Sequence, residues 1–160
     1  MRKLMGLIMS LFVLGSCGNS KKVVECSEAH DQSTESMLFE LVGKGNLGGA
    51  GEEGIEKSNL VIQSQEAWDR LVSKINAVNK ESERFYIQNI DFNEYTVIAC
   101  FDKVQSSGGY TIKITDVQEG DNEVHVLMKS TSPDGMATSV MTQPYYIVVI
   151  PKTSKEVIFI

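Results

Sequence analysis

The sequence is poor in the side chains from which most active sites are built. Its 160 residues include only two histidines, three cysteines and one tryptophan. His30 lies in a polar stretch and His125 stands alone in a strand-like run, so neither has neighbours at metal-ligand spacing. Acyl transfer needs a nucleophile beside a base, and no serine or cysteine motif accompanies His125. We therefore predict a non-catalytic protein with no metal or other cofactor; carboxylates that converge from distant positions are the open alternative.

Clusters of basic residues are also missing. The chain has 15 Lys and Arg against 21 Asp and Glu, a net charge of −6, and loss of Arg2 and Lys3 with residues 1–16 would change −6 to −8. Nucleic-acid binding depends on grouped basic side chains that neutralise phosphates. The sequence thus predicts no nucleic-acid partner and no recruitment to an anionic membrane by charge alone.

The apolar run near the N-terminus is too short to span a bilayer. Residues 1–16 combine a basic start, the run from Leu4 to Leu14 and two small residues, which is the pattern of a signal peptide. The sequence Leu14-Gly15-Ser16-Cys17 resembles the bacterial lipobox, in which the cysteine becomes the lipid-modified N-terminus. We predict palmitate-type lipidation at Cys17 and a lipoprotein of the bacterial cell envelope, with the outer membrane as its destination. The alternative is an ordinary secretory signal with a chance cysteine.

Residues 17–36 are polar and lack periodicity, and we interpret them as the lipidated N-terminus and a flexible tether that reaches about 25 Å. Cys26 lies in this stretch and Cys100 lies in an apolar strand-like run. A disulfide between them is chemically possible in an oxidising envelope. The alternative is that Cys100 is a small buried hydrophobic residue.

Residues 37–160 are predicted to form one globular domain with one helix. Ser64 is a suitable N-cap, and apolar residues then recur at three- and four-residue spacing from Ala67 to Val78. Trp68 is expected to anchor this helix in the core. Strand-like segments flank it at 37–42, 59–63, 85–87, 95–101, 110–115, 124–128, 139–142, 145–150 and 157–160. The apolar run 95–101 is expected in the middle of the sheet, and the alternation in 110–115 predicts one buried and one solvent-exposed face. Hairpins are expected through residues 119–122 and 152–155.

The fold class predicted from these segments is α+β: a mainly antiparallel β-sheet, as a partly open barrel or a sandwich, with one principal α-helix. The glycines of Gly43–Gly48 match GxGxxG after a strand. Residues 49–58 are too rich in glycine and acid to begin a phosphate-binding helix. We therefore interpret the glycine-rich stretch as a flexible loop.

Two segments with turn-forming residues are candidate binding loops. Gly108-Gly109 allows two consecutive positive φ angles in a tight connection between strands. Pro144 indicates a bulge, an edge position or a cis-peptide turn. Tyrosine offers a rigid contact at low entropic cost, so we predict that the two segments form one surface patch, the alternative being purely structural turns. The candidate residues are Ser107, Gly108, Gly109, Tyr110, Gln143, Pro144 and Tyr145.

Several motifs together resemble the C-terminal domain of PrcB-type protease complex subunits, over roughly residues 38–160. The resemblance implies a non-catalytic lipoprotein that binds protein or serves as an accessory domain of a protease complex. Two alternatives stay open: a chagasin-like protease inhibitor, whose loops also place a glycine or proline before an aromatic residue, and a structural envelope component. The motifs are Glu66-Ala67-Trp68, Ile90-Asp91-Phe92, Ser107-Gly108-Gly109-Tyr110-Thr111-Ile112, Pro133-Asp134-Gly135 and Thr142-Gln143-Pro144-Tyr145.

Overall fold

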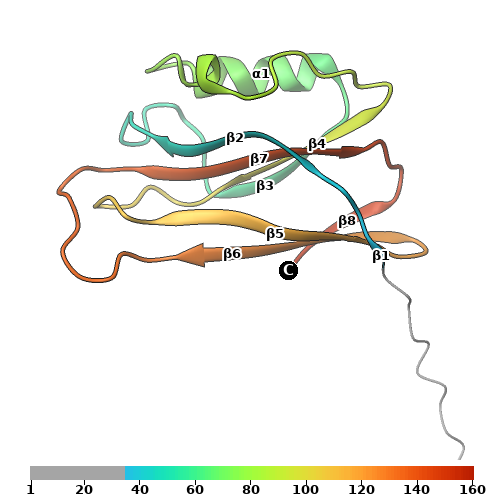
Figure 1. Ribbon diagram of the computed structural model, residues 1–160. Helices are drawn as coiled ribbons and strands as arrows, with labels where there is room; N and C mark the ends of the chain where they lie inside the picture. Colours follow the sequence, from blue (N-terminus) through green and yellow to red (C-terminus); the bar gives the residue numbers. More distant parts are fainter. Residues whose placement is uncertain (1–34) are drawn as a thin grey trace, which may run out of the picture. The chain divides into compact units, whose positions relative to one another are not determined.

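The computed structural model describes residues 35–160. The predicted signal peptide, the lipidation site Cys17, Cys26, His30 and nearly all of the predicted tether lie outside the described residues. The described chain forms three layers, in which helix α1 covers one sheet and that sheet packs on a second one (Figure 1). The first sheet has the strand order β2-β7-β4-β3 and the second β1-β5-β6-β8. The elements are β1 (Glu35–Ser36), β2 (Glu40–Leu47), β3 (Ser58–Ile62), α1 (Gln65–Ile75), the 3-10 helix η1 (Glu81–Arg84), β4 (Tyr95–Phe101), β5 (Thr111–Glu119), β6 (Glu123–Thr131), β7 (Gln143–Pro151) and β8 (Glu156–Phe159).

The first sheet is buried on both faces because its central strands, β4 and β7, consist almost entirely of apolar residues. Side chains alternate along a strand, so Val97, Ala99 and Phe101 face the helix while Ile98 and Cys100 face the second sheet. One sheet therefore serves two hydrophobic cores. The predicted position of residues 95–101 in the middle of a sheet is confirmed.

Helix α1 begins as its sequence predicts. The Ser64 hydroxyl accepts a hydrogen bond from the Ala67 N–H at 3.3 Å and caps the first turn. Trp68 is 5% exposed, so its predicted core position is confirmed. The helix ends at Ile75, one turn earlier than its apolar stripe suggests, and Val78 is exposed.

The second sheet has one wet face, as the period-two pattern of β5 predicts. A bulge between Ile114 and Asp116 resets the alternation, so that Val117 points inward again. The turn after Glu119 joins β5 to β6 as expected. Strand β8 instead pairs with β6 in parallel, because β7 lies in the other sheet; the predicted last hairpin from β7 is wrong.

The predicted fold class is confirmed: the domain is α+β and mainly antiparallel, with one principal helix, and of the two forms considered it is the sandwich rather than a barrel. Strand β2 runs straight through the glycines that we interpreted as the start of a flexible loop. It does so because β7 pairs along it as far as Leu47. Gly43 also has a packing role, since an added Cβ would lie 2.5 Å from the Phe85 ring.

Two short strand predictions are wrong. Residues 85–87 follow η1 as irregular chain, although the Tyr86 N–H donates to the Val42 carbonyl at the rim of β2. Residues 139–141 belong to the long connection between β6 and β7, and only Thr142 forms an isolated bridge, with Gln105. Phe85 and Ile87 pack in the helix-side core instead of in a ladder, whereas Val140 and Met141 are exposed.

Candidate functional site

The segment Ser107–Tyr110 lies in the crossover from β4 to β5, which are strands of different sheets, so the predicted tight turn between neighbouring strands is wrong. Gly109 has a positive φ of 89°, as expected. Gly108 does not, and it is instead a packing glycine, because a Cβ there would lie 2.5 Å from the Thr138 hydroxyl.

The two predicted binding segments meet at one end of the sandwich. The Thr142 hydroxyl donates to the Ser107 carbonyl at 3.0 Å. The backbones of Gln105 and Thr142 exchange two hydrogen bonds, of 2.7 and 3.1 Å. The predicted proximity of segments more than 30 residues apart is therefore confirmed.

The second of these segments is not on the surface. Gln143 is 1% exposed, Tyr145 is 2% exposed and Pro144 is also buried. The prediction that they form an exposed loop is wrong because β7 begins at Gln143 and lies between β2 and β4. The combined patch is therefore limited to its first half, where Gly109 is exposed and Ser107 and Tyr110 are half-buried.

Pro144 sits inside a paired strand because its neighbour supplies the donor that it lacks. The Asp102 N–H donates to the Pro144 carbonyl at 2.9 Å, but Pro144 has no N–H to return to Asp102. The side-chain amide of Gln143 donates to the Asp102 carbonyl at 2.9 Å instead, and to the Ile55 carbonyl at 2.7 Å. The Gln-Pro pair thus joins three segments at the end of the first sheet.

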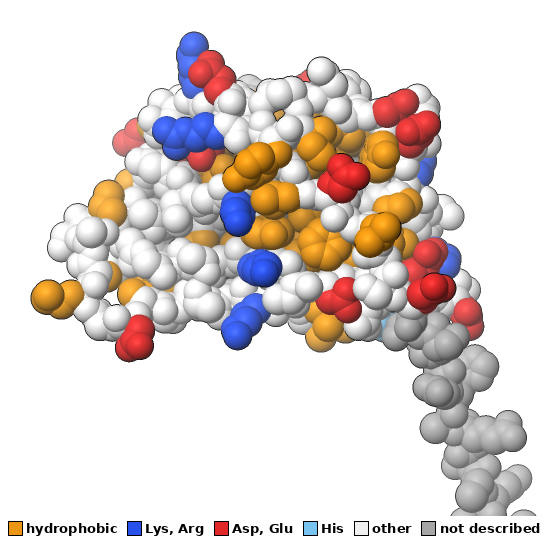
Figure 2. All heavy atoms as spheres, viewed as in Figure 1, with side chains coloured by type: hydrophobic (Ala, Val, Ile, Leu, Met, Phe, Trp, Pro, Cys, Tyr) orange, Lys and Arg blue, Asp and Glu red, His pale blue; other side chains and the backbone are white. Residues whose placement is uncertain are grey.

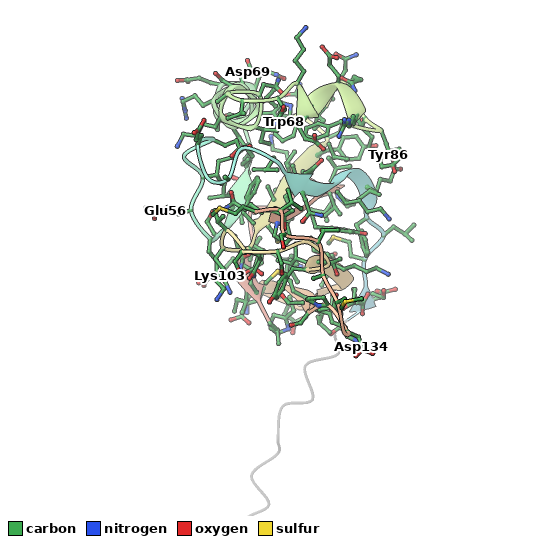
Figure 3. All side chains as sticks on the ribbon, turned by 90° about the vertical axis from the view of Figure 1, so that its left-hand side faces the viewer. Glu56, Trp68, Asp69, Tyr86, Lys103 and Asp134 are labelled. Atoms are coloured by element: carbon green, nitrogen blue, oxygen red, sulfur yellow. The ribbon has the colours of Figure 1, made fainter. Side chains whose placement is uncertain are left out.

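Tyr145 is a core residue on the helix side. Its ring centroid lies 6.3 Å from those of Phe85 and Phe101, and its hydroxyl donates to Glu81 at 2.9 Å. Burial, and then the hydrogen bond to Glu81, raise the pKa of the Tyr145 hydroxyl well above its ordinary value. Seen from the end of the sandwich, Trp68 points into this same core beneath α1, while Tyr86 points to solvent (Figure 3).

A surface groove of about 380 Å³ lies between the edges of β2 and β5, next to the predicted segments. Tyr110 leads directly into its lower wall, and Tyr145 and Tyr146 contribute from β7. In Figure 1 the two edges lie one above the other, facing the viewer. We define this seam groove by Lys44, Gly45, Asn46, Thr111, Ile112, Lys113, Tyr145 and Tyr146.

Three exposed lysines mark this side of the domain. Lys44 and Lys113 line the seam groove, and Lys129 lies directly opposite Lys113 in the β5–β6 ladder. Among residues 35–160, no ion pair includes any of the three. Basic side chains follow one another from strand to strand on this face, beside apolar side chains (Figure 2).

Sequence reasoning missed these lysines for a geometric reason. Counting back from the β5–β6 turn in an unbroken register places Ser130 opposite Lys113, and the bulge at Thr115 shifts the pairing to Lys129. The wet face of β5 was visible in the alternation, but its cross-strand partners were not.

Asp102 forms a second set of polar contacts at the end of the first sheet, next to Gln143. Asp102 accepts from the Gln105 amide at 3.0 Å and pairs with Lys57 at 3.3 Å. Burial tends to raise the pKa of the Asp102 carboxyl, but the Lys103 N–H, Gln105 and Lys57 outweigh it and lower the pKa overall. In the described part of the chain no three His, Cys, Asp or Glu side chains are grouped for a metal ion, and no helix is long and apolar enough to cross a membrane.

The described domain is an α+β sandwich with one principal helix and a groove lined by two lysines between β2 and β5. Residues 96–151 match the family described as PrcB C-terminal, and this match supports the resemblance noted in the sequence. The match spans β4 to β7 and includes both segments predicted as binding loops. No curated protein and no solved structure matches the chain.

Proposed function

We propose that this protein is a non-catalytic accessory lipoprotein of the bacterial cell envelope that binds protein as part of a protease complex. The observation that carries the proposal is the PrcB C-terminal match over residues 96–151, since this family is an accessory rather than a catalytic one. The lipobox resemblance at Leu14–Cys17 supplies the anchor in the proposal. More than one acyl chain at Cys17 would hold the domain stably at a membrane, because each buried methylene adds about 0.8 kcal/mol.

The chagasin-like alternative loses its main support. It requires Pro144 and Tyr145 to be presented on an exposed loop, and both are buried in β7. A purely structural envelope component is the remaining competitor, and it differs from the proposal in having no specific protein partner.

The anchor is tested by Cys17→Ser in the full chain. We expect the wild-type protein to fractionate with membranes and its N-terminal peptide to carry acyl chains by mass spectrometry, and the variant to become soluble or to stay unprocessed. A variant that is still cleaved and membrane-bound contradicts lipidation at Cys17.

The accessory role is tested by photo-crosslinking in the native envelope. A crosslinking amino acid is placed at exposed positions of each face, for example Asn46, Asp69 and Glu156. We expect one face to give a discrete product that contains a protease-complex component. Crosslinks that are absent or equally diffuse from every face contradict the role.

A further inference from the structure

Two free strand edges of the described domain, those of β2 and β5, border the seam groove. Strand β1 pairs with β5 at Gln118 and Glu119 and the Met37 N–H donates to the Val117 carbonyl, which leaves the edge of β5 open at Thr111–Thr115. Strand β2 is the outermost strand of its sheet. We propose that the seam groove between β2 and β5 binds an extended, acidic segment of a partner protein as an added β-strand. This inference rests on the proposed function and specifies how the partner is held.

The backbone at the seam is available for pairing. The outer edge of β2 is already hydrogen-bonded at Val42, whose carbonyl accepts from the Tyr86 N–H at 2.8 Å. Beyond it, within residues 35–160, neither Lys44–Leu47 nor Thr111–Thr115 forms a backbone hydrogen bond outside its own sheet. Outward N–H and C=O groups of an edge strand bind an extended chain by continuing the ladder.

The groove also accommodates the alternate side chains of such a strand. Gly45 contributes only backbone to the groove, and Ile112 and Tyr146, both largely buried, form an apolar floor. Successive residues of an extended chain point to opposite sides. Every second side chain of the bound segment therefore faces this floor and the others face the lysines and solvent.

The lysines determine the charge of the occupant. Like charges directly opposite one another in a ladder are destabilising, yet Lys113 and Lys129 are so placed, with Lys44 across the groove. The chain as a whole carries −6, so this basic face runs against its overall balance. Carboxylates on a bound segment would remove the repulsion and steer the encounter, which makes an acidic segment the complementary partner.

A groove beside the edge strand β3 is less suited to an acidic strand. It lies between β3 and α1, is about 330 Å³ in volume and is lined mostly by apolar side chains. Strand β3 has only five residues, and of the two basic residues there Arg70 is already paired with Glu66. Lys74, the second, therefore provides a matched control.

The test uses the full chain and a fluorescent acidic peptide of about eight residues that alternates glutamate with valine or threonine. We expect saturable binding by anisotropy that weakens with salt, and binding at least about tenfold weaker to the Lys44→Glu/Lys113→Glu variant. Lys74→Glu should bind within about twofold of wild type. Equal loss in Lys74→Glu, equal binding of a lysine-for-glutamate peptide, or no binding at about millimolar peptide overturns the proposal.

A second arm separates strand addition from simple charge attraction. The same peptide, N-methylated at alternate residues, keeps its charges but cannot complete a ladder. We expect it to bind at least about tenfold more weakly, and the unmodified peptide to slow amide exchange at residues 44–47. Equal binding of the methylated peptide overturns strand addition. If the peptide does not bind at the seam groove but another face gives a discrete crosslink, this inference alone is refuted. If no face gives a discrete crosslink, the proposed function itself is refuted.

Discussion

At the scale of single residues, Lys113 is expected to favour binding of the acidic peptide at a cost in folding stability. It faces Lys129 across the β5–β6 ladder, both side chains are exposed, and no ion pair in the described chain relieves the repulsion. Lys113→Glu should therefore raise the free energy of unfolding by about 0.2–1 kcal/mol, as measured in urea, while weakening the binding of the acidic peptide. Lys74→Glu is the control, with no expected gain. A Lys113→Glu protein that is less stable than wild type contradicts the repulsion.

A second prediction at this scale concerns the Gln143–Pro144 pair. Gln143→Leu leaves the Asp102 and Ile55 carbonyls without their side-chain donor and should cost at least about 1–3 kcal/mol of stability. Pro144→Ala restores an N–H opposite Asp102, so the same Gln143 substitution should cost less in that background. A double-mutant cycle in urea measures this coupling, which we expect to be about 0.5–1.5 kcal/mol. Strictly additive effects would show that Gln143 does not stand in for the missing proline donor.

At the scale of elements, the glycines in and directly after β2 differ in how closely they are packed. An alanine Cβ at Gly43 would lie 2.5 Å from the Phe85 ring, whereas at Gly48 its nearest neighbour is the Asn79 amide at 3.5 Å. We expect Gly43→Ala to lower stability by about 1–3 kcal/mol through overpacking. Gly48→Ala should change it by less than about 0.5 kcal/mol, as is usual where nothing is displaced. Thermal melts compare the two, and equal losses would contradict the packing role of Gly43.

The elements that could be predicted from sequence are those whose signals are local. Helix α1 combines the Ser64 cap with an apolar stripe, and β4 is a continuous apolar run, so each can be predicted from its own residues. Strand β2 was cut short at its glycines because its continuation depends on pairing with β7, a partner about a hundred residues away.

The candidate site was predicted in part for the same reason. The sequence marked both turn-forming segments, and they do meet at one end of the sandwich. It gave no sign that Tyr145 is enclosed by Phe85 and Phe101, because that burial depends on which strands flank β7. Nor did it reveal the seam groove, whose walls come from strands of different sheets.

At the scale of the whole molecule, one sheet shared by two cores predicts that the three layers unfold together. Trp68, the only tryptophan, reports on the helix-side core, and Cys100 lies in the core between the sheets. Burial raises the pKa of the Cys100 thiol to about 12, so alkylation requires opening of β4.

We expect Trp68 fluorescence and iodoacetamide labelling of the Cys100 peptide, followed by mass spectrometry, to change at the same urea concentration. The peptide-level readout distinguishes Cys100 from Cys17 and Cys26 in the full chain. Labelling of Cys100 well before the fluorescence transition would show that the second sheet detaches while the helix layer persists.

The free edge of β2 could pair with the same edge of another copy of this protein where copies are concentrated. Two identical edges brought side by side could continue one ladder into another, which is how exposed strands lead to aggregation. In such a pair each copy would present its Lys44 and Lys113 to the same residues of its neighbour, so the contact would bring like charges together. Charged residues on edge strands are a common device against such self-pairing. The lysines that suit an acidic partner thus also keep crowded copies apart, and the edge stays open until that partner arrives.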